Sequence, residues 1–219
     1  MSSLSSTDLP TDNNLFSRIA DDIYQQGFSI QESALPESLA NCLWEYNQAM
    51  SVRQFQQAGI GRKDDFQENG AVRRDEICWI DGTSEAGAAW LDWTGELKTY
   101  LNRRLLLGLY SFESHFAMYQ EGAFYKRHLD AFKGQTNRVL SLVTYLNRDW
   151  QEDDGGHLVL YKDSADITGI KVLPKLGTVV VFLSEEFPHE VLPASRCRNS
   201  IAGWFRVNGS TGDIIDPPQ

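Results

Sequence analysis

The chain has 219 residues, of which 42% are hydrophobic, 11% aromatic and 23% charged. This composition is typical of a globular protein with one sizeable core, and it excludes disordered and collagen-like chains. There are 30 acidic and 20 basic residues, a net charge of −10 that disfavours nucleic acid as a partner.

Cys42, Cys78 and Cys197 form no CxxC pair and no disulfide framework, which favours a reducing compartment. No apolar run approaches the roughly 18 residues of a membrane span, and the start of the chain lacks the pattern of a signal peptide. We therefore expect a cytoplasmic protein with no membrane partner.

Residues 1–12 are polar and predict a flexible lead-in to a single domain over residues 13–219. Leu15, Ile19 and Ile23 recur at helical spacing, and Gly27 is suited to end that helix. The segment 28–30 predicts a short strand. These elements open a helical support predicted over residues 13–110.

Two further helices are predicted before residue 110. The first follows Pro36 and places Leu39, Leu43, Tyr46 and Met50 on one face. The second runs from about residue 84 to 107, is capped by Thr83 or Ser84, and carries core residues at helical spacing. These core residues are Trp90, Trp93, Leu97, Leu101 and Leu105.

Between these two helices lies a polar, glycine-containing segment, residues 56–75, which is long for a simple connector. It is either a lid or a solvated loop.

From His115 onward the hydrophobic period changes to two, and turn residues separate six to eight short strands. The expected strands are 116–119, 124–128, 139–146, 157–161, 177–183 and 200–207. No helical pattern falls between them, so an antiparallel sandwich or jelly roll over 112–207 is favoured over a parallel sheet. The fold class is therefore α+β.

His128 and Asp130 lie at i and i+2 of a strand-like segment, so their side chains share one face with Cα atoms about 7 Å apart. His189, in FPHEV, follows on another strand-like segment. Two imidazoles and one carboxylate form the facial ligand set of non-haem Fe(II) oxygenases. By itself, however, an H-x-D pair also arises often on a surface strand by chance.

Arg198 follows His189 in HEVLPASRCRNS. A guanidinium there can form a bidentate pair with the distal carboxylate of a dicarboxylic acid. A metal triad with such an arginine is the signature of 2-oxoglutarate use, in which the keto acid and O2 share the remaining metal positions.

From about Phe116 to Phe205 the chain resembles the prolyl hydroxylases that modify hypoxia-inducible factor, together with their bacterial relatives among the Fe(II)/2-oxoglutarate dioxygenases. The likeness is carried by MYQEGAFYKRHLDAF, VTYLNRDW, GGHLVLY and PHEVLPASRCR followed by GWF, and more weakly by RRDEICWIDG. It implies a double-stranded β-helix (jelly roll) with N-terminal helices bracing one sheet.

The resemblance makes His128, Asp130 and His189 the iron ligands and Arg198 the partner of the 2-oxoglutarate 5-carboxylate. Tyr145 would share that carboxylate, and Tyr119 would donate nearer the metal. Without the resemblance, both tyrosines would be interpreted as half-buried sheet aromatics. The other pocket-lining positions that it implies are Leu158, Val191 and Trp204.

The resemblance also favours the lid, with Arg73, Arg74 and Asp75 at its closing end and a possible pair between Asp75 and Arg138. It implies hydroxylation of a peptidyl proline at C4 with Fe(II), 2-oxoglutarate and O2, and with ascorbate as reductant. Elongation factor Tu is the candidate partner, because some bacterial relatives modify it, and we expect a monomer.

Two departures limit the resemblance. Ala202 stands where the animal enzymes have threonine, and the tail after Phe205 lacks their charged helix, which leaves the substrate open. Trp204 also stands where nucleic-acid demethylases have a second arginine. A noncatalytic jelly-roll module that binds the metal, or an oxygenase acting on another side chain, remains an alternative.

Overall fold

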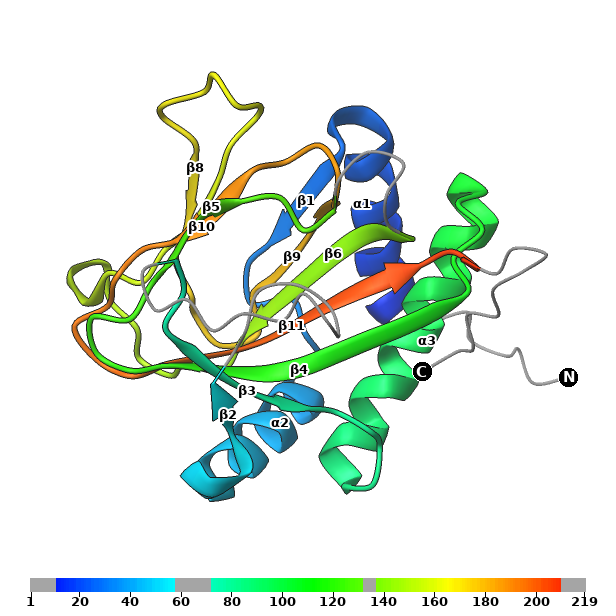
Figure 1. The fold of residues 1–219 in the computed structure, drawn as a ribbon. Helices are drawn as coiled ribbons and strands as arrows, with labels where there is room; N and C mark the ends of the chain where they lie inside the picture. Colours follow the sequence, from blue (N-terminus) through cyan, green and yellow to red (C-terminus); the bar gives the residue numbers. More distant parts are fainter. Residues whose placement is uncertain (1–10, 58–71, 132–136, 210–219) are drawn as a thin grey trace, which may run out of the picture.

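A computed structural model describes residues 11–57, 72–131 and 137–209 of the chain (Figure 1). The elements follow in the order α1 (Thr11–Gln26), β1 (Phe28–Gln31), α2 (Glu37–Ala49), η1 (Val52–Gln54), β2 (Gln56–Gln57), β3 (Asp75–Trp79), α3 (Glu85–Leu105), β4 (Ser111–Tyr119), β5 (Tyr125–His128), β6 (Arg138–Tyr145), η3 (Glu152–Asp154), β7 (Leu158–Leu160), β8 (Ile170–Val172), β9 (Val179–Leu183), β10 (His189–Val191) and β11 (Arg198–Arg206).

The three predicted helices are confirmed. Helix α1 ends where Gly27 adopts a φ of +82°, a left-handed conformation that a glycine tolerates, and the Gly27 N–H donates to the Ile23 carbonyl. Ser84 caps α3 by accepting from the Gly87 N–H at 3.0 Å. Because α1 begins at Thr11, residues 11 and 12 belong to the helix and not to the predicted lead-in. Residues 1–10 lie outside the described part.

Two antiparallel sheets form the rest of the fold. The larger has the order β1-β9-β6-β11-β4-β3-β2 and the smaller β5-β10-β7-β8. The eight strands from β4 to β11 confirm the predicted jelly-roll half. However, β1, β2 and β3 extend the larger sheet with residues assigned to a helical support, so the division at residue 110 is not structural.

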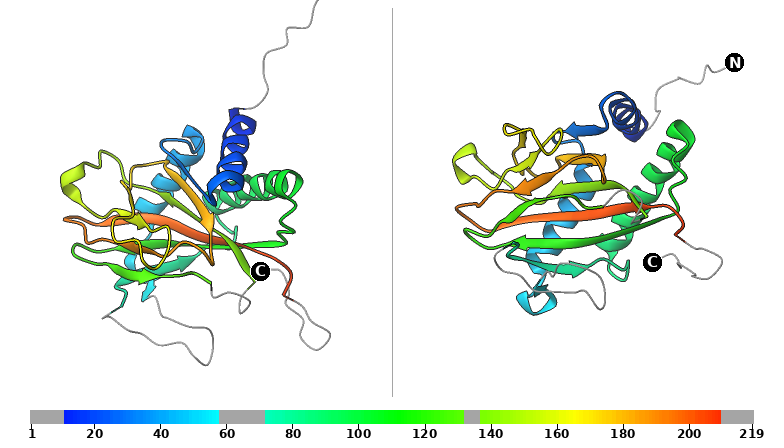
Figure 2. Two further views of the ribbon diagram at one scale, coloured as in Figure 1. Left: turned by 90° about the horizontal axis from the view of Figure 1, so that it is seen from above. Right: turned by 45° about the horizontal axis from the view of Figure 1, so that its top comes forward.

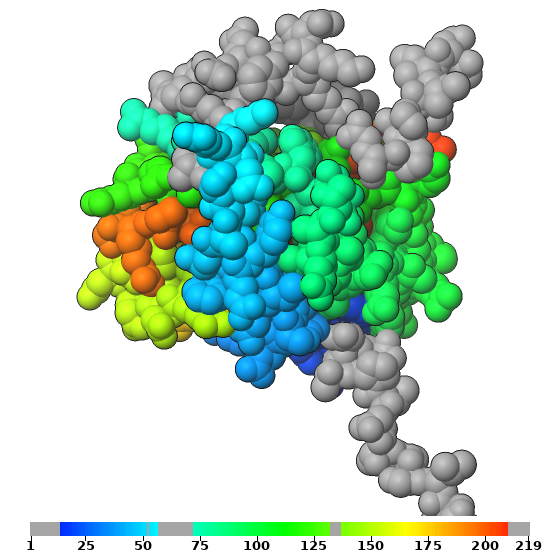
Figure 3. All heavy atoms as spheres, turned by 90° about the horizontal axis from the view of Figure 1, so that it is seen from below, coloured from blue at the N-terminus to red at the C-terminus, as the bar shows by residue number. Residues whose placement is uncertain are grey.

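Alternation along the central strands separates two cores. On β9, Val179 and Val181 pack toward the helices, whereas Val180 and Phe182 pack toward the smaller sheet. The helices thus lie against one face of the larger sheet, and the smaller sheet lies against the other (Figures 1 and 2). On the helical side, α2 and α3 lie side by side (Figure 3). The predicted bracing of one sheet is confirmed.

The cysteines are free thiols: Cys42, Cys78 and Cys197. Among the described helices, none combines the length and the apolar character that a bilayer-crossing segment needs.

Candidate metal centre and active-site cavity

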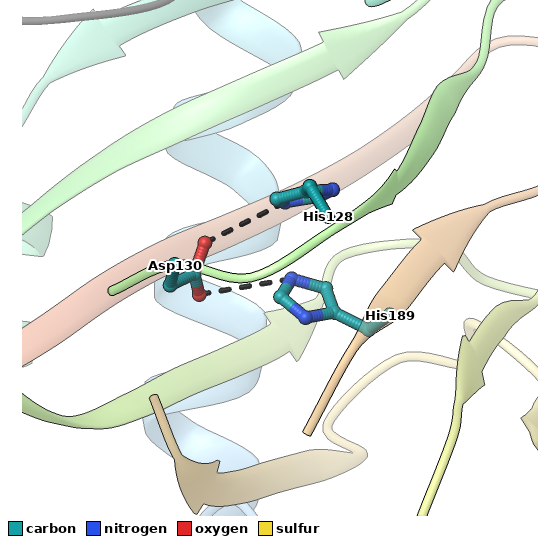
Figure 4. Close-up of side chains that lie close together, drawn as sticks. All are labelled: His128, Asp130 and His189. Atoms are coloured by element: carbon teal, nitrogen blue, oxygen red, sulfur yellow. Dashed lines mark ion pairs between the residues drawn. The ribbon is translucent and has the colours of Figure 1, made fainter. Parts of the chain in front are cut away.

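Three side chains with metal-ligating atoms converge between the two sheets. His128 Nε2 lies 3.5 Å from Asp130 Oδ1, and His189 Nε2 lies 3.6 Å from Asp130 Oδ2 (Figure 4). One ligand atom from each of the three lies within 4.8 Å of the others. In the described part of the chain, this is the one group of three or more such residues that could hold a metal ion.

The strand register brings the two histidines together, since His189 on β10 is directly opposite His128 on β5. Each imidazole then contacts the carbonyl two residues before it. His128 Nδ1 lies 2.7 Å from the Lys126 oxygen, and His189 Nδ1 lies 3.1 Å from the Phe187 oxygen. A proton on Nδ1 satisfies each contact and leaves the Nε2 lone pair for a metal.

Asp130 is placed differently from the prediction. Strand β5 ends at His128, so Asp130 does not share a strand face with it. Its carboxylate instead accepts a hydrogen bond from the Ser141 hydroxyl at 2.6 Å, which fixes it beside the histidines. The prediction of proximity holds, but the reason is a contact with β6 rather than alternation along one strand.

Ionisation also suits these groups for metal binding. Burial works to raise the pKa of Asp130, but His189, His128 and the Ser141 hydroxyl hold it well below its usual value. Burial lowers the pKa of His189 to about 4, against the opposing effect of Asp130. Near pH 7 the site therefore offers an ionised carboxylate and a neutral His189 imidazole.

The three residues open into a cavity of about 530 Å³ between the sheets. Side chains at alternate positions of the neighbouring strands β4 and β11 form part of its wall, on the face of the larger sheet that is directed toward the smaller sheet. Of the predicted pocket residues, the cavity lining includes Tyr119, Leu158, Val191, Arg198 and Trp204.

Arg198 lies in this wall and is almost fully buried, with 1% of its surface exposed. Its Nε donates to the Gly156 carbonyl at 2.8 Å, and its Nη1 donates to the Ser200 hydroxyl at 3.2 Å. No carboxylate of the described residues forms an ion pair with it. A buried guanidinium without a counter-ion is costly, so this position is built to receive an anion.

Two tyrosines flank the Arg198 guanidinium. The Arg198 Cζ atom lies 4.9 Å from the centre of the Tyr119 ring and 5.0 Å from the centre of the Tyr145 ring. The Tyr145 hydroxyl is buried with no hydrogen-bond partner among the described residues. Burial raises the pKa of Tyr145 to about 12, against the opposing effect of Arg198, so the hydroxyl keeps its proton as a donor.

The expected pair between Asp75 and Arg138 is wrong. In the register of the larger sheet, Asp75 aligns with Arg198 at one end of β11. Arg138 pairs with Arg206 at the other end of that strand, so the two residues are far apart. Asp75 instead accepts two hydrogen bonds from Arg73, at 2.7 and 2.5 Å.

Arg138 forms its ion pair at 2.7 Å with Glu113 and stacks on the Trp204 ring at 3.7 Å. Arg74 lies over the Phe124 ring, 5.1 Å from its centre, and is not part of the cavity lining. The predicted lid falls largely on residues 58–71, outside the described part.

His115 and Trp79 also line the cavity, although neither was predicted as a site residue. Their rings meet edge to face at 5.2 Å, and burial lowers the pKa of His115 to about 4. The signal that could have found His115 is alternation, because it lies on the same face of β4 as Ala117 and Tyr119. His157 is buried beside Glu152 at 3.0 Å and is not part of the metal group.

Comparisons with known proteins agree with this geometry. Residues 114–206 match the model of the 2OG-Fe(II) oxygenase superfamily. A crystal structure of a Pseudomonas putida prolyl-4-hydroxylase is 40% identical, with a TM-score of 0.78 over 89% of this chain and 100% of that one. The chain belongs to the 2OG-Fe(II) oxygenase superfamily.

More distant relatives include one solved structure with the same fold and two proteins matched by sequence. A prolyl hydroxylase from Trichoplax adhaerens, solved with a peptide of hypoxia-inducible factor, is 24% identical with a TM-score of 0.76, over 89% of this chain and 90% of that one. Human Egl nine homolog 1 is 27% identical over 67% of this chain, and the hypoxia-inducible factor prolyl hydroxylase of Caenorhabditis elegans is 29% identical over 65%. The match spans 35% and 21% of those two proteins.

Proposed function

We propose that this oxygenase hydroxylates a proline at C4 within a protein or peptide, with 2-oxoglutarate as cosubstrate. In the balanced reaction, one oxygen atom of O2 enters the proline C–H bond. The other enters succinate as 2-oxoglutarate loses CO2. The observation that carries the proposal is the buried, unpaired Arg198 in the same cavity as the metal-ligating trio.

The donor set fits Fe(II), because two neutral imidazoles and a carboxylate are the protein ligands of non-haem iron oxygenases. His128, Asp130 and His189 would hold the ion, and bound iron would supply the activation of O2. Two backbone carbonyls and the Ser141 hydroxyl orient these ligands. The protein thus fixes the ligand directions before the metal arrives.

The other end of the cavity fits the distal carboxylate of 2-oxoglutarate. Arg198 offers N–H groups that no described residue uses, and the Tyr145 hydroxyl offers a further donor. Two or more charge-assisted hydrogen bonds would hold the carboxylate and exclude water from it. Tyr119 lines the same cavity beside Arg198 and is suited to donate to the keto-acid end.

The proline would bind in the part of the cavity that Trp79, His115 and Trp204 line with aromatic surfaces. The Trp204 indole N–H is buried without a partner among the described residues, so it can donate to a substrate carbonyl. By resemblance to the bacterial relatives, we infer elongation factor Tu as the substrate. A cytoplasmic location follows from that inference, and we separately propose that the enzyme is a monomer.

The test is anaerobic reconstitution with Fe(II), followed by aerobic conversion of 2-oxoglutarate to succinate with ascorbate as reductant. The assay is run with and without purified elongation factor Tu, and the factor is then analysed by mass spectrometry. Stimulated succinate formation with one added oxygen atom on a single proline supports reaction and partner together.

Each other outcome is equally specific. Turnover without modification of the factor keeps the oxygenase and rejects this partner, whereas oxygen on another residue rejects proline as the target. Iron-loaded protein that binds 2-oxoglutarate but does not consume it with any candidate peptide supports the noncatalytic module. Omitting ascorbate shows whether the enzyme needs a reductant.

A further inference from the structure

The His128 imidazole is the end of a three-layer stack. It lies flat against the Tyr125 ring, with ring centres 3.5 Å apart and planes 16° from parallel. On Tyr125 lies the guanidinium of Arg73, 4.4 Å from the ring centre. We propose that Arg73 and Tyr125 are positioning residues, which fix the plane of the His128 ring so that its Nε2 faces the metal.

A bulge in β5 creates the stack. Tyr125 and His128 are three residues apart, so regular alternation would place them on opposite faces of the strand. Their partners on β10, Val191 and His189, are only two residues apart, so β5 carries one extra residue. That extra residue turns both rings to the same side, and re-aiming a side chain beside an active site is a recurrent use of bulges.

Backbone contacts hold Arg73 over Tyr125. Arg73 pairs with Tyr125 as an isolated antiparallel bridge. On either side of it, the Arg74 N–H donates to the Phe124 carbonyl at 3.0 Å and the Lys126 N–H to the Val72 carbonyl at 2.9 Å. Residues 72–74 therefore form a short extension of the smaller sheet that sets the position of Arg73.

The side chain of Arg73 is fixed as well. It donates from both Nε and Nη2 to Asp75, whose exposed fraction is 1%. A planar guanidinium held by two parallel hydrogen bonds has a defined plane, which suits it to stacking. The fixed plane of the Arg73 guanidinium therefore restrains the orientation of the Tyr125 ring, and the Tyr125 ring in turn restrains the imidazole of His128.

Apart from this stack, fewer contacts restrain the ring plane of His128 than restrain the other two ligand side chains. Ser141 holds Asp130, and His189 is buried against Phe182 with ring centres 4.8 Å apart. The Nδ1 contact of His128 with the Lys126 carbonyl fixes one atom of the ring, but the ring plane can still tilt about that contact. The Tyr125 face blocks this tilt.

Arg73 also lines the cavity, so a ligand at the cavity wall contacts the outer layer of the stack. The stack thereby connects the part of the cavity wall formed by Arg73 with the geometry of one metal ligand. This inference rests on the proposed metal site, because it concerns how His128 presents its nitrogen to that metal.

The experiment measures Mn(II) affinity by calorimetry and the visible absorption of the Co(II)-loaded protein. The variants are Tyr125→Leu, Tyr125→Phe and Arg73→Met, each checked for folding by circular dichroism. The matched control is Arg127→Met, because Arg127 also stacks on a tyrosine, Tyr161 at 3.7 Å, but that stack ends at no metal ligand.

We expect Tyr125→Leu and Arg73→Met to weaken Mn(II) binding roughly 10- to 100-fold, the usual cost of losing a group that orients a metal ligand. The Co(II) spectrum should shift in the same variants. Tyr125→Phe keeps the ring and should restore affinity and spectrum, and Arg127→Met should leave both as in the unmodified protein.

Unchanged affinity and spectrum in a folded Tyr125→Leu protein overturn the proposal, as does an equal loss in Arg127→Met. Tyr125→Leu preserves the Arg73–Asp75 pair, so it decides the question even if Arg73→Met does not fold. If the unmodified protein binds neither Mn(II) nor Co(II), the proposed function has failed instead, which distinguishes the two.

Discussion

Replacing Arg198 with methionine removes the buried cavity cation that has no carboxylate partner among the described residues, while keeping a side chain of similar length. Arg198 is 1% exposed, and its guanidinium donates two hydrogen bonds within the protein, to the Gly156 carbonyl and the Ser200 hydroxyl. Its other N–H groups are left for a ligand. We therefore expect Arg198→Met to lose specifically the interaction with the distal carboxylate of 2-oxoglutarate.

The size of the loss follows from burial. A hydrogen bond to a charged group contributes about 1.5–3 kcal/mol, and breaking a buried ion pair costs up to about 5 kcal/mol. The expected loss for 2-oxoglutarate is thus about 1.5–5 kcal/mol, or at least a tenfold weaker Kd. The ligand-free variant should be no less stable to urea, because a buried cation without a counter-ion costs free energy.

Calorimetric titration of 2-oxoglutarate into Mn(II)-loaded protein measures the loss without turnover. The matched ligand is 2-oxopentanoate, which has the same chain length but a methyl group in place of the distal carboxylate. The unmodified protein should prefer 2-oxoglutarate, and Arg198→Met should lose that preference. An unchanged Kd for 2-oxoglutarate, or an equal loss for both acids, would refute the role of Arg198.

Three other substitutions test separate parts of the site. Asp130→Ala should abolish Mn(II) binding and turnover, and full activity would remove Asp130 from the ligand set. Gly156 has a φ of +68°, and an added Cβ would lie 3.2 Å from Arg198 Cδ, so Gly156→Ala should weaken 2-oxoglutarate binding and lower the free energy of unfolding by about 1–3 kcal/mol. The pKa of His115 is about 4 in the folded protein and about 6.5 when unfolded, so between pH 6.5 and 4 the unfolded state binds a proton that the folded state does not. Acidification over this range should therefore lower the free energy of unfolding of the metal-free protein by up to about 3 kcal/mol more than that of the metal-free His115→Met variant, as measured by urea titration. The same pH dependence in both proteins would contradict this.

The sequence predicted the elements best where the apolar pattern is strong and continuous. Leu15, Ile19 and Ile23 mark α1 because one face of that helix lies on a core. The unbroken apolar run Val179–Leu183 marks β9 because both faces of that strand are buried, one in each core. It failed for β3, since Asp75–Trp79 is short and follows a polar segment. Pairing with β4 on one side and β2 on the other makes those residues a strand, and both pairings join residues far apart in the sequence.

The ligand residues were predictable, but their arrangement was not. A spacing of two suggested that His128 and Asp130 share a strand face, yet β5 ends at His128 and Ser141 sets the place of Asp130. Likewise, nothing local indicates the bulge that stacks Tyr125 on His128. Both features depend on where another strand lies, so the spacing of residues along one segment cannot specify them.

Local and long-range contacts therefore have separate tasks at this site. Each histidine meets the carbonyl two residues before it, His128 at Lys126 and His189 at Phe187, so a contact within each segment fixes which nitrogen carries the proton. The register of β5 and β10 then sets how far apart the two free nitrogens lie. A substitution that shifts this register should move the metal nitrogens apart while leaving both carbonyl contacts intact, which makes the distance between the imidazoles, and not their tautomers, the vulnerable part of the centre.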